Sequence, residues 1–266
     1  MSKRLHAKYW VFLILFPFSL ILTGCEINDF DGDPNSEYRE SFLFTKAVGA
    51  RSELFVSNVN GTVTVIGVDT LNELRISGSK IVKDQSDDEA RRHIVDIEID
   101  MQESPSTLTI KTLQPNTSGR RTYQVNYEVM IPSSWRVTIS NVNGNVDMQN
   151  IRNTVSTTVV NGTVNATEIA GNVSVTVTNG VISGKVQIPE NGSCAFNLVN
   201  GNATLLVPRT TSASVTATVT LGTVSLSNLP IVYSTNTLTS VTGVVGAGKG
   251  TIRLSSANGV VQLLGY

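Results

Sequence analysis

The sequence predicts an all-β protein, and three observations lead to this fold class. Short runs such as FVSNVNGTVTVIGV alternate apolar and polar residues, and a period of two is typical of half-buried strands. Such runs end on Asn-Gly six times, in the pieces NVNG, NVNG, VVNG, VTNG, LVNG and SANG. Glycines are also evenly spaced: Gly144, Gly162, Gly180, Gly201, Gly222 and Gly243 are separated by 18, 18, 21, 21 and 21 residues. The second half of the chain therefore contains an internal repeat of about 20 residues.

The sequence of this repeat is compatible with two arrangements of its strands. Asn-Gly is a good two-residue hairpin turn and would give an antiparallel meander. Stacked parallel coils explain better why whole units resemble one another, because equivalent residues then lie above one another. We therefore predict a parallel single-stranded β-helix, or β-solenoid, over residues 138–266. Glycine adopts the left-handed conformation at a corner most easily. The predicted repeat corners are Gly61, Gly144, Gly162, Gly180, Gly201, Gly222 and Gly259.

The first 24 residues have the features of a secretory signal peptide. Three basic residues precede an apolar stretch of 13 residues, Trp10 to Leu22, which is short for a membrane span. The stretch ends in Leu22-Thr23-Gly24-Cys25, which resembles the lipobox of bacterial lipoproteins. The resemblance implies cleavage before Cys25 and a lipid on that residue. It predicts an exported, membrane-anchored lipoprotein, placed at the outer membrane or cell surface rather than the inner membrane.

An acidic segment, residues 25–45, follows the predicted lipid site. It has few periodic apolar positions, and we predict a tether between lipid and domain. Asp29, Asp31 and Asp33 imitate part of a calcium loop, but the later Glu and the flanking helices of such a loop are missing. A solvated spacer is the favoured interpretation.

Residues 46–137 are predicted to form a more irregular β portion of the same domain. Within it, SDDEARRHI at 86–94 begins with acidic and ends with basic residues, which favours one short helix. The next stretch, IVDIEIDM, alternates and predicts a strand from about Ile94. Asp96, Glu98 and Asp100 would then share one face, more typical of a solvated surface than of a cation site.

Charge and motif content argue against catalysis. The net charge of −1 gives no indication of a nucleic-acid partner. Of 21 acidic residues, 17 lie in residues 26–103, so the repeat half has few groups for acid–base work. Cys194 has apolar neighbours, and His93 is far from it in the sequence. We therefore predict a protein that is no enzyme, with no catalytic residue, no metal site and no cofactor.

The order of these features resembles the bacterial putative-adhesin family of β-strand-repeat proteins. The likeness rests on the repeated xVNG pieces, on YEVMIPSSWRVTISNVNGNVDM and on GAGKGTIRLSSANGVVQLLG, and it covers roughly residues 46–266. It implies a single-stranded β-helix and an adhesive or scaffolding role. The stretch LGTVSLSNLP departs from the pattern, because Leu221 stands where Asn is usual.

The sequence thus predicts a lipid-anchored cell-envelope protein that works by non-catalytic binding or scaffolding. Its partners would be the membrane, through Cys25, and envelope glycans or surface proteins. The alternatives are a polysaccharide-acting β-helix enzyme and a carbohydrate-binding module. Both require features that are scarce in this sequence: the enzyme requires paired carboxylates, and the binding module requires clustered aromatic residues that stack on sugars.

Overall fold

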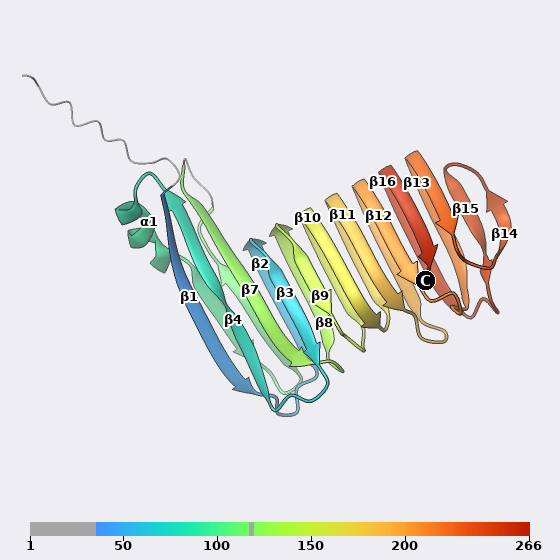
Figure 1. The fold of residues 1–266 in the computed structure, drawn as a ribbon. Coiled ribbons are helices and arrows are strands. Elements are labelled where there is room, and N and C mark those ends of the chain that lie inside the picture. The colour runs from blue at the N-terminus through green and yellow to red at the C-terminus, as the bar shows by residue number, and fades with distance from the viewer. Residues whose placement is uncertain (1–35, 117–119) are drawn as a thin grey trace, which may run out of the picture. The chain divides into compact units, whose positions relative to one another are not determined.

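The computed structural model describes residues 36–116 and 120–266, which all belong to one compact unit. The regular structure of this part is strand, apart from one short α-helix and one 3-10 turn. The strands join into one sheet that does not close on itself (Figure 1). The predicted all-β class and the single short helix are confirmed. The elements are β1 (Ser36–Ala47), β2 (Glu53–Asn60), β3 (Val63–Val68), β4 (Glu73–Asp84), α1 (Asp87–His93), the 3-10 turn (Ile94–Asp96), β5 (Glu98–Glu103), β6 (Thr107–Leu113), β7 (Thr122–Pro132), β8 (Arg136–Asn143), β9 (Val146–Gln149), β10 (Val155–Ala170), β11 (Val173–Gln187), β12 (Ser193–Val207), β13 (Ala213–Ser227), β14 (Ile231–Asn236), β15 (Ser240–Val245) and β16 (Gly250–Gly265).

The repeat half is built from long strands that each contain a first arm, an Asn-Gly or Leu-Gly step, and a second arm. β10 pairs in parallel with β8 along its first arm and with β9 along its second. It also pairs with β11 along both arms, so that Val155 faces Val173 and Gly162 faces Gly180. The 18-residue spacing of the sequence is therefore the spacing of stacked parallel strands, and no hairpin forms at these Asn-Gly steps.

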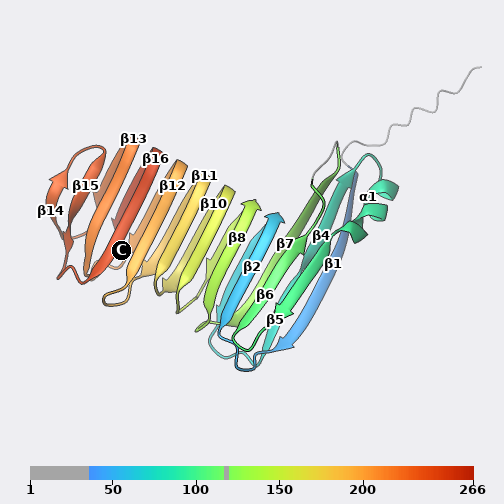
Figure 2. The same cartoon turned by 180° about the vertical axis from the view of Figure 1, so that it is seen from behind.

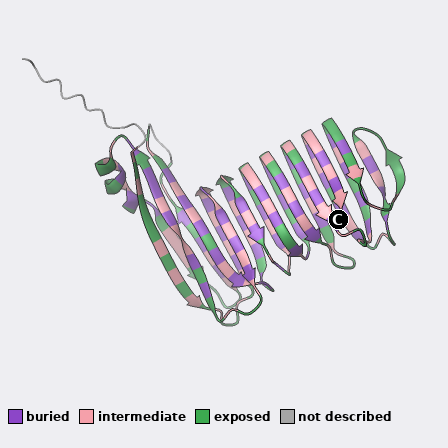
Figure 3. Ribbon diagram, viewed as in Figure 1, coloured by how far each residue is buried: buried purple, intermediate pink, exposed green. Residues whose placement is uncertain are grey.

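The first and second arms face each other across an apolar core. Alternate residues of both arms are buried, as the striping of Figure 3 shows. Thr157 in a first arm donates a hydrogen bond to the sulfur of Met148 in a second arm, 3.4 Å away. The ring of Phe196, also in a first arm, lies against Gly184 in a second arm. One cluster of buried residues runs from Leu54 to Leu263, and each fully buried Val or Leu contributes about 1.5–3 kcal/mol of stability.

Seven glycines follow the Asn or Leu of these steps, and they are the seven predicted repeat corners. Their φ values lie between +119° and +157°, which side chains rarely adopt. A Cβ on Gly180 would lie 1.8 Å from the carbonyl oxygen of Gly162, and the same close approach recurs up the stack. Gly243 differs, because it lies inside β15 and pairs with Val215 and Tyr233. The expectation that the 21-residue repeat continues through Gly243 is wrong.

The order of the strands departs from the sequence at the far end of the stack. β16 lies between β12 and β13, parallel to both. β15 then pairs antiparallel with β13, and β14 pairs with β15 at the end. Figures 1 and 2 show β14 at the opposite end from β1 and α1. The C-terminal segment thus forms an interior strand, with its Asn-Gly step between the Asn-Gly step of β12 and the Leu-Gly step of β13.

The N-terminal portion begins with antiparallel pairing. β1 pairs with β4 along twelve residues and β4 pairs with β7, while β2 and β3 join the parallel stack. The predicted tether is therefore wrong from Ser36 onward: Tyr38, Phe42 and Phe44 pack against the core and fix this segment as a strand. The strand expected from Ile94 begins at Glu98, after the 3-10 turn. Asp96 lies in that turn and shares no strand face with Glu98 and Asp100.

Candidate interaction surface

The Asn-Gly steps place six asparagine side chains in one hydrogen-bonded column, which we call the asparagine ladder. From Asn143 onward, each Nδ2 donates to the Oδ1 of the preceding asparagine in the column at 2.7–2.9 Å. The ladder consists of Asn60, Asn143, Asn161, Asn179, Asn200 and Asn258, in spatial order. Because the strands are in register, identical side chains meet at the strand spacing and each amide serves as donor and acceptor at once.

The two ends of the ladder are different. At the N-terminal end, Asn60 donates to the backbone oxygen of Tyr123 at 2.9 Å. At the other end, Asn258 faces Leu221, whose side chain is 68% exposed. The ladder therefore stops at Leu221, the position at which the sequence departs from the family pattern.

The outer face of the first arms carries an uncharged row of short polar side chains, which we call the hydroxyl row. Each member is the Cα partner of the next across eight strands. The hydroxyl row comprises Ser57, Ser140, Thr158, Thr176, Asn197, Ser255, Thr218 and Ser240. Ser255 donates a hydrogen bond to Asn197, 2.9 Å from Oγ to Oδ1. Thr158, Thr176 and Asn197 are exposed, and the other members are half-buried. A ribbon of this kind offers donors and acceptors at regular spacing.

The outer face of the second arms is less uniform. Its corresponding row contains the carboxylates Glu128 and Asp147 among polar residues. Asn165 donates to Asp147 at 2.7 Å, so part of this row is already hydrogen-bonded within the protein. The hydroxyl row is therefore the longer uncharged surface of the two.

A hollow of about 470 Å³ lies where the turns after β11 and β12 approach the β15–β16 turn. Its lining includes Pro189, Pro208 and Ala247, and the ion pair between Lys249 and Glu190 lies beside them. One carboxylate, tied to a lysine, does not form the pair that glycoside hydrolysis requires. The hollow therefore lacks the carboxylate pair of a glycoside hydrolase.

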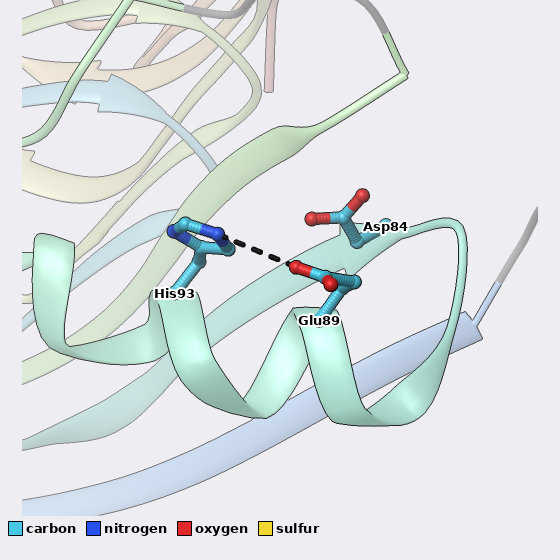
Figure 4. Close-up of side chains that lie close together, drawn as sticks. All are labelled: Asp84, Glu89 and His93. Atoms are coloured by element: carbon cyan, nitrogen blue, oxygen red, sulfur yellow. Dashed lines mark ion pairs between the residues drawn. The ribbon is translucent and has the colours of Figure 1, made fainter.

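Asp84 at the end of β4 and Glu89 and His93 of α1 are brought together, with ligand atoms within 4.8 Å of one another (Figure 4). Ser86 caps this helix through its hydroxyl, so the sequence signal for the helix is explained. Asp84 is nevertheless bonded to Arg121, 2.5 Å from Nε to Oδ2. His93 Nδ1 lies 2.8 Å from the Asp96 carboxylate.

The charges of this cluster are thus already satisfied within the protein. Burial by itself would raise the pKa of Asp84, but the hydrogen bonds from Arg121 and the Gln85 amide outweigh it, and the pKa is lowered. The hydrogen bond with His93 likewise lowers the pKa of Asp96. A guanidinium beside Asp84 would oppose a bound cation, so the cluster is an ion-pair network that holds α1 against the sheet. Its members are up to 37 residues apart, so no local signal in the sequence indicated that they meet.

The other residues considered for chemistry are separated. Cys194 is buried, and burial raises the pKa of its thiol to about 12, which suits a small apolar core residue. Tyr127 is buried too, with its pKa raised to about 12, and its hydroxyl lies 2.7 Å from that of Thr112. In the strand pairing, Tyr127 lies opposite Gly78 and Cys194 lies opposite Val173, so neither residue is beside the cluster at α1.

The predicted signal peptide, the lipobox Leu22-Thr23-Gly24-Cys25 and the acidic residues up to Asp33 lie outside the described residues. Among the residues that are described, no helix is both long enough and apolar enough to cross a membrane.

Comparison with known proteins gives structural relatives only. No protein-family profile matches the chain, and no curated protein sequence does. A solved structure described as a putative cell adhesion protein from Clostridium sporogenes matches 85% of this chain and 100% of its own, with a TM-score of 0.51 and 12% identity. Structures described as putative adhesins from Bacteroides fragilis and Parabacteroides distasonis cover 85% and 84% of this chain, with TM-scores of 0.33 and 0.28 and 11% identity each.

At such identities only the fold is comparable, and of these structures only the first is similar enough in fold to be compared. Its match covers 85% of this chain, which is more than the parallel stack alone could supply. The resemblance to the putative-adhesin family is confirmed at the level of fold: this chain has the fold of the putative cell adhesion protein of Clostridium sporogenes.

Proposed function

We propose that this protein is a lipid-anchored component of the cell envelope that binds a partner through its hydroxyl row without catalysing a reaction. The anchor would be the lipid on Cys25. The domain that it carries would be a single-stranded β-solenoid, whose stacked parallel arms present long, regular faces. The partner would be an envelope polymer rich in hydroxyl or amide groups, such as a glycan strand.

The observation that carries the proposal is the hydroxyl row itself. Eight strands contribute an uncharged polar side chain to one line, because the strands are in register. An extended polymer lying across the strands could hydrogen-bond to several members at once. Many weak contacts of this kind add up along a chain, as in multivalent binding.

The distribution of charge supports binding without turnover. The repeat half, 138–266, contains three acidic residues, Asp147, Glu168 and Glu190, and two of them form ion pairs with Lys185 and Lys249. The resemblance in fold to a putative cell adhesion protein supports the same role. The runner-up is a carbohydrate-binding module in the narrow sense, but no group of exposed aromatic rings accompanies the hydroxyl row among the described residues.

Co-sedimentation of the purified chain from residue 26 onward with insoluble cell-wall glycan tests the proposal. Binding should change little between low and high salt, because few charges are available to be screened. The double variant Thr158→Glu, Thr176→Glu should lose most of the binding. The matched control, Thr167→Glu with Ser225→Glu on the second arms, should keep it. Equal loss in both variants, or release of soluble fragments from the glycan by repurified protein, would contradict the proposal.

A further inference from the structure

The end of the stack farthest from β1 is closed by a hairpin whose last strand has one free edge. β14 pairs with β15 on one side, and no other described strand pairs with it. After Ile231, every residue of β14 is exposed, so neither face of this strand is covered (Figure 3). An edge strand of this kind presents a row of backbone N–H and C=O groups that are available to another strand.

This edge lacks the usual protection against pairing. Natural edge strands carry charged residues, above all lysine, on or beside the strand. No Asp, Glu, Lys, Arg or His occurs in residues 210–248, which include β13, β14 and β15. The edge strand at the opposite end, β1, contains Glu37, Arg39, Glu40 and Lys46. Only Pro230 and a bulge between Tyr233 and Thr235 interrupt the free edge of β14.

Apolar side chains gather at the same end. Val232 in β14 is 75% exposed, and Leu238 in the turn after it is 76% exposed. Tyr233 and Val244 are also exposed large apolar residues of this hairpin. Exposed apolar residues grouped beside an open edge are typical of a surface that another protein covers.

We propose that β14 pairs antiparallel with β14 of a second copy of this chain. A two-fold contact places the same strand on both sides of the interface, so the strand must be complementary to a second copy of itself. An uncharged strand with neutral neighbours meets this requirement, because two copies bring no like charges together. The charged edge β1 does not, since a second copy would oppose lysine, arginine and glutamate with themselves in several registers.

The position of β14 also indicates what the pairing would do, and this step rests on the proposed function. The described chain enters the stack at Ser36 in β1, and β14 lies at the other end (Figure 1). If Cys25 anchors the chain, β14 is the part most distant along the stack from the anchored side. Pairing between two such ends would then join proteins held on two facing surfaces, which is homophilic adhesion.

Sedimentation equilibrium of the chain from residue 26 onward tests the pairing directly. We expect a reversible dimer, and Val232→Lys should raise its dissociation constant by roughly tenfold or more, because two-fold symmetry repeats the new charge in both copies. The matched control is Leu43→Lys, the same change on an exposed residue of β1, which should leave the dimer intact. A wild-type chain that stays monomeric, or a dimer that Val232→Lys does not weaken, would overturn the proposal.

A second measurement is independent of the stability of the lysine variant. Ser234→Cys introduces a thiol at the free strand, and the buried Cys194 does not compete for oxidation. Mild oxidation should give a disulfide-linked dimer, whereas the same change at Ser41 in β1 should not. Linkage at Ser41 but not at Ser234 would assign the contact to the other end and overturn the proposal.

Beads that carry the chain through its N-terminal end separate pairing from glycan binding. Beads should aggregate without added polymer, and Val232→Lys should abolish the aggregation while Thr158→Glu with Thr176→Glu leaves it unchanged. The reverse result would show that the hydroxyl row, and not β14, makes the contact between copies. If glycan binding fails while the beads still aggregate, the proposed function is contradicted and the pairing of β14 is supported.

Discussion

At Gly180 the chain has no room for a side chain, for two separate reasons. Its φ of +149° disfavours any residue with a Cβ, and that Cβ would lie 1.8 Å from the Gly162 carbonyl oxygen. The second reason is the stronger one, since the obstacle is the backbone of the neighbouring strand and cannot turn away. Glycine at these steps is thus required by the close stacking of strands as well as by the turn.

Replacement of Gly180 by alanine should therefore lower the free energy of unfolding by about 3 kcal/mol or more, the upper end of what backbone strain alone costs. Gly49→Ala is the matched control, because Gly49 also has positive φ but a Cβ there meets only the end of Arg51 at 4.0 Å. It should cost about 1 kcal/mol. Urea unfolding of both variants gives the comparison, and equal losses would contradict the role of stacking.

Leu221→Asn should extend the asparagine ladder by one member. Leu221 is the strand partner of Asn258, and a new amide there can donate to the Asn258 Oδ1. One such hydrogen bond stabilises a protein by about 0.5–1.5 kcal/mol. Leu221→Asp introduces a side chain of the same shape as asparagine but without an amide donor, so it should not raise the stability. Thermal unfolding distinguishes the two, and a gain with aspartate would show that the loss of an exposed leucine is the cause.

At the scale of elements, the ion pair between Asp84 and Arg121 joins the end of β4 to the start of β7 beside α1. The Asp84 side chain is only 5% exposed, so removal of its partner leaves a buried carboxylate. Arg121→Met should lower the free energy of unfolding at pH 7 by about 1–3 kcal/mol. Arg152→Met is the control, because its pair with Asp69 is exposed and contributes about 0–1 kcal/mol.

The pH dependence of this difference follows from the lowered pKa of Asp84. A carboxylate whose pKa is lower in the folded than in the unfolded state stabilises the fold above its unfolded pKa, about 3.9. That stabilisation is lost as pH falls through the folded pKa. The gap between wild type and Arg121→Met, measured by urea unfolding, should therefore narrow as the pH falls below about 4. A gap that widens in acid would contradict this assignment.

β16 stabilises its neighbours on both sides. Its second arm pairs with residues 203–207 of β12 on one side and with residues 224–227 of β13 on the other. Truncation after Ser256 should therefore expose two interior edges, lower the thermal stability strongly and cause aggregation. Removal of Tyr266 alone should have a small effect. Circular dichroism and light scattering measure both, and a truncated chain as stable as wild type would contradict the interior position of β16.

The sequence predicted some elements better than others, for identifiable reasons. The helix at 86–94 was predictable because its cap and its charge distribution are local signals. β1 was missed because Glu37, Arg39 and Glu40 obscure the alternation of its apolar residues. The insertion of β16 could not be predicted, since all Asn-Gly units are alike and the partners Asn200 and Asn258 are 58 residues apart. The uncharged stretch 210–248 is visible in the sequence, but its meaning depends on that topology.

For the molecule as a whole, the parallel stack implies that one unit can be removed. Deletion of 162–179 joins Asn161 to Gly180, so the first arm of β10 continues into the second arm of β11. Asn161 keeps its bond to Asn143 and meets Asn200 in place of Asn179. The shortened chain should fold with a modest loss of stability, since each unit contacts only its neighbours.

A deletion of half a unit is the control for this prediction. Removal of 162–170 joins two first arms and leaves the second arms of β9 and β11 without the strand between them. This variant should aggregate or fail to fold, although it loses fewer residues. Size-exclusion chromatography compares the two, and a better-folded half-unit deletion would contradict the stacked arrangement.

The insertion of β16 also has a consequence for the time course of folding. When β13 has been synthesised, the position between β12 and β13 is still empty, because β16, which fills it, follows only after the β14–β15 hairpin. Contacts between such distant residues form slowly, because the chain must close a long loop before it gains their energy. The far end of the stack is therefore expected to remain open until β16 has emerged. A polypeptide that passes through a secretion channel in extended form benefits from such a delay, because premature folding would block its passage.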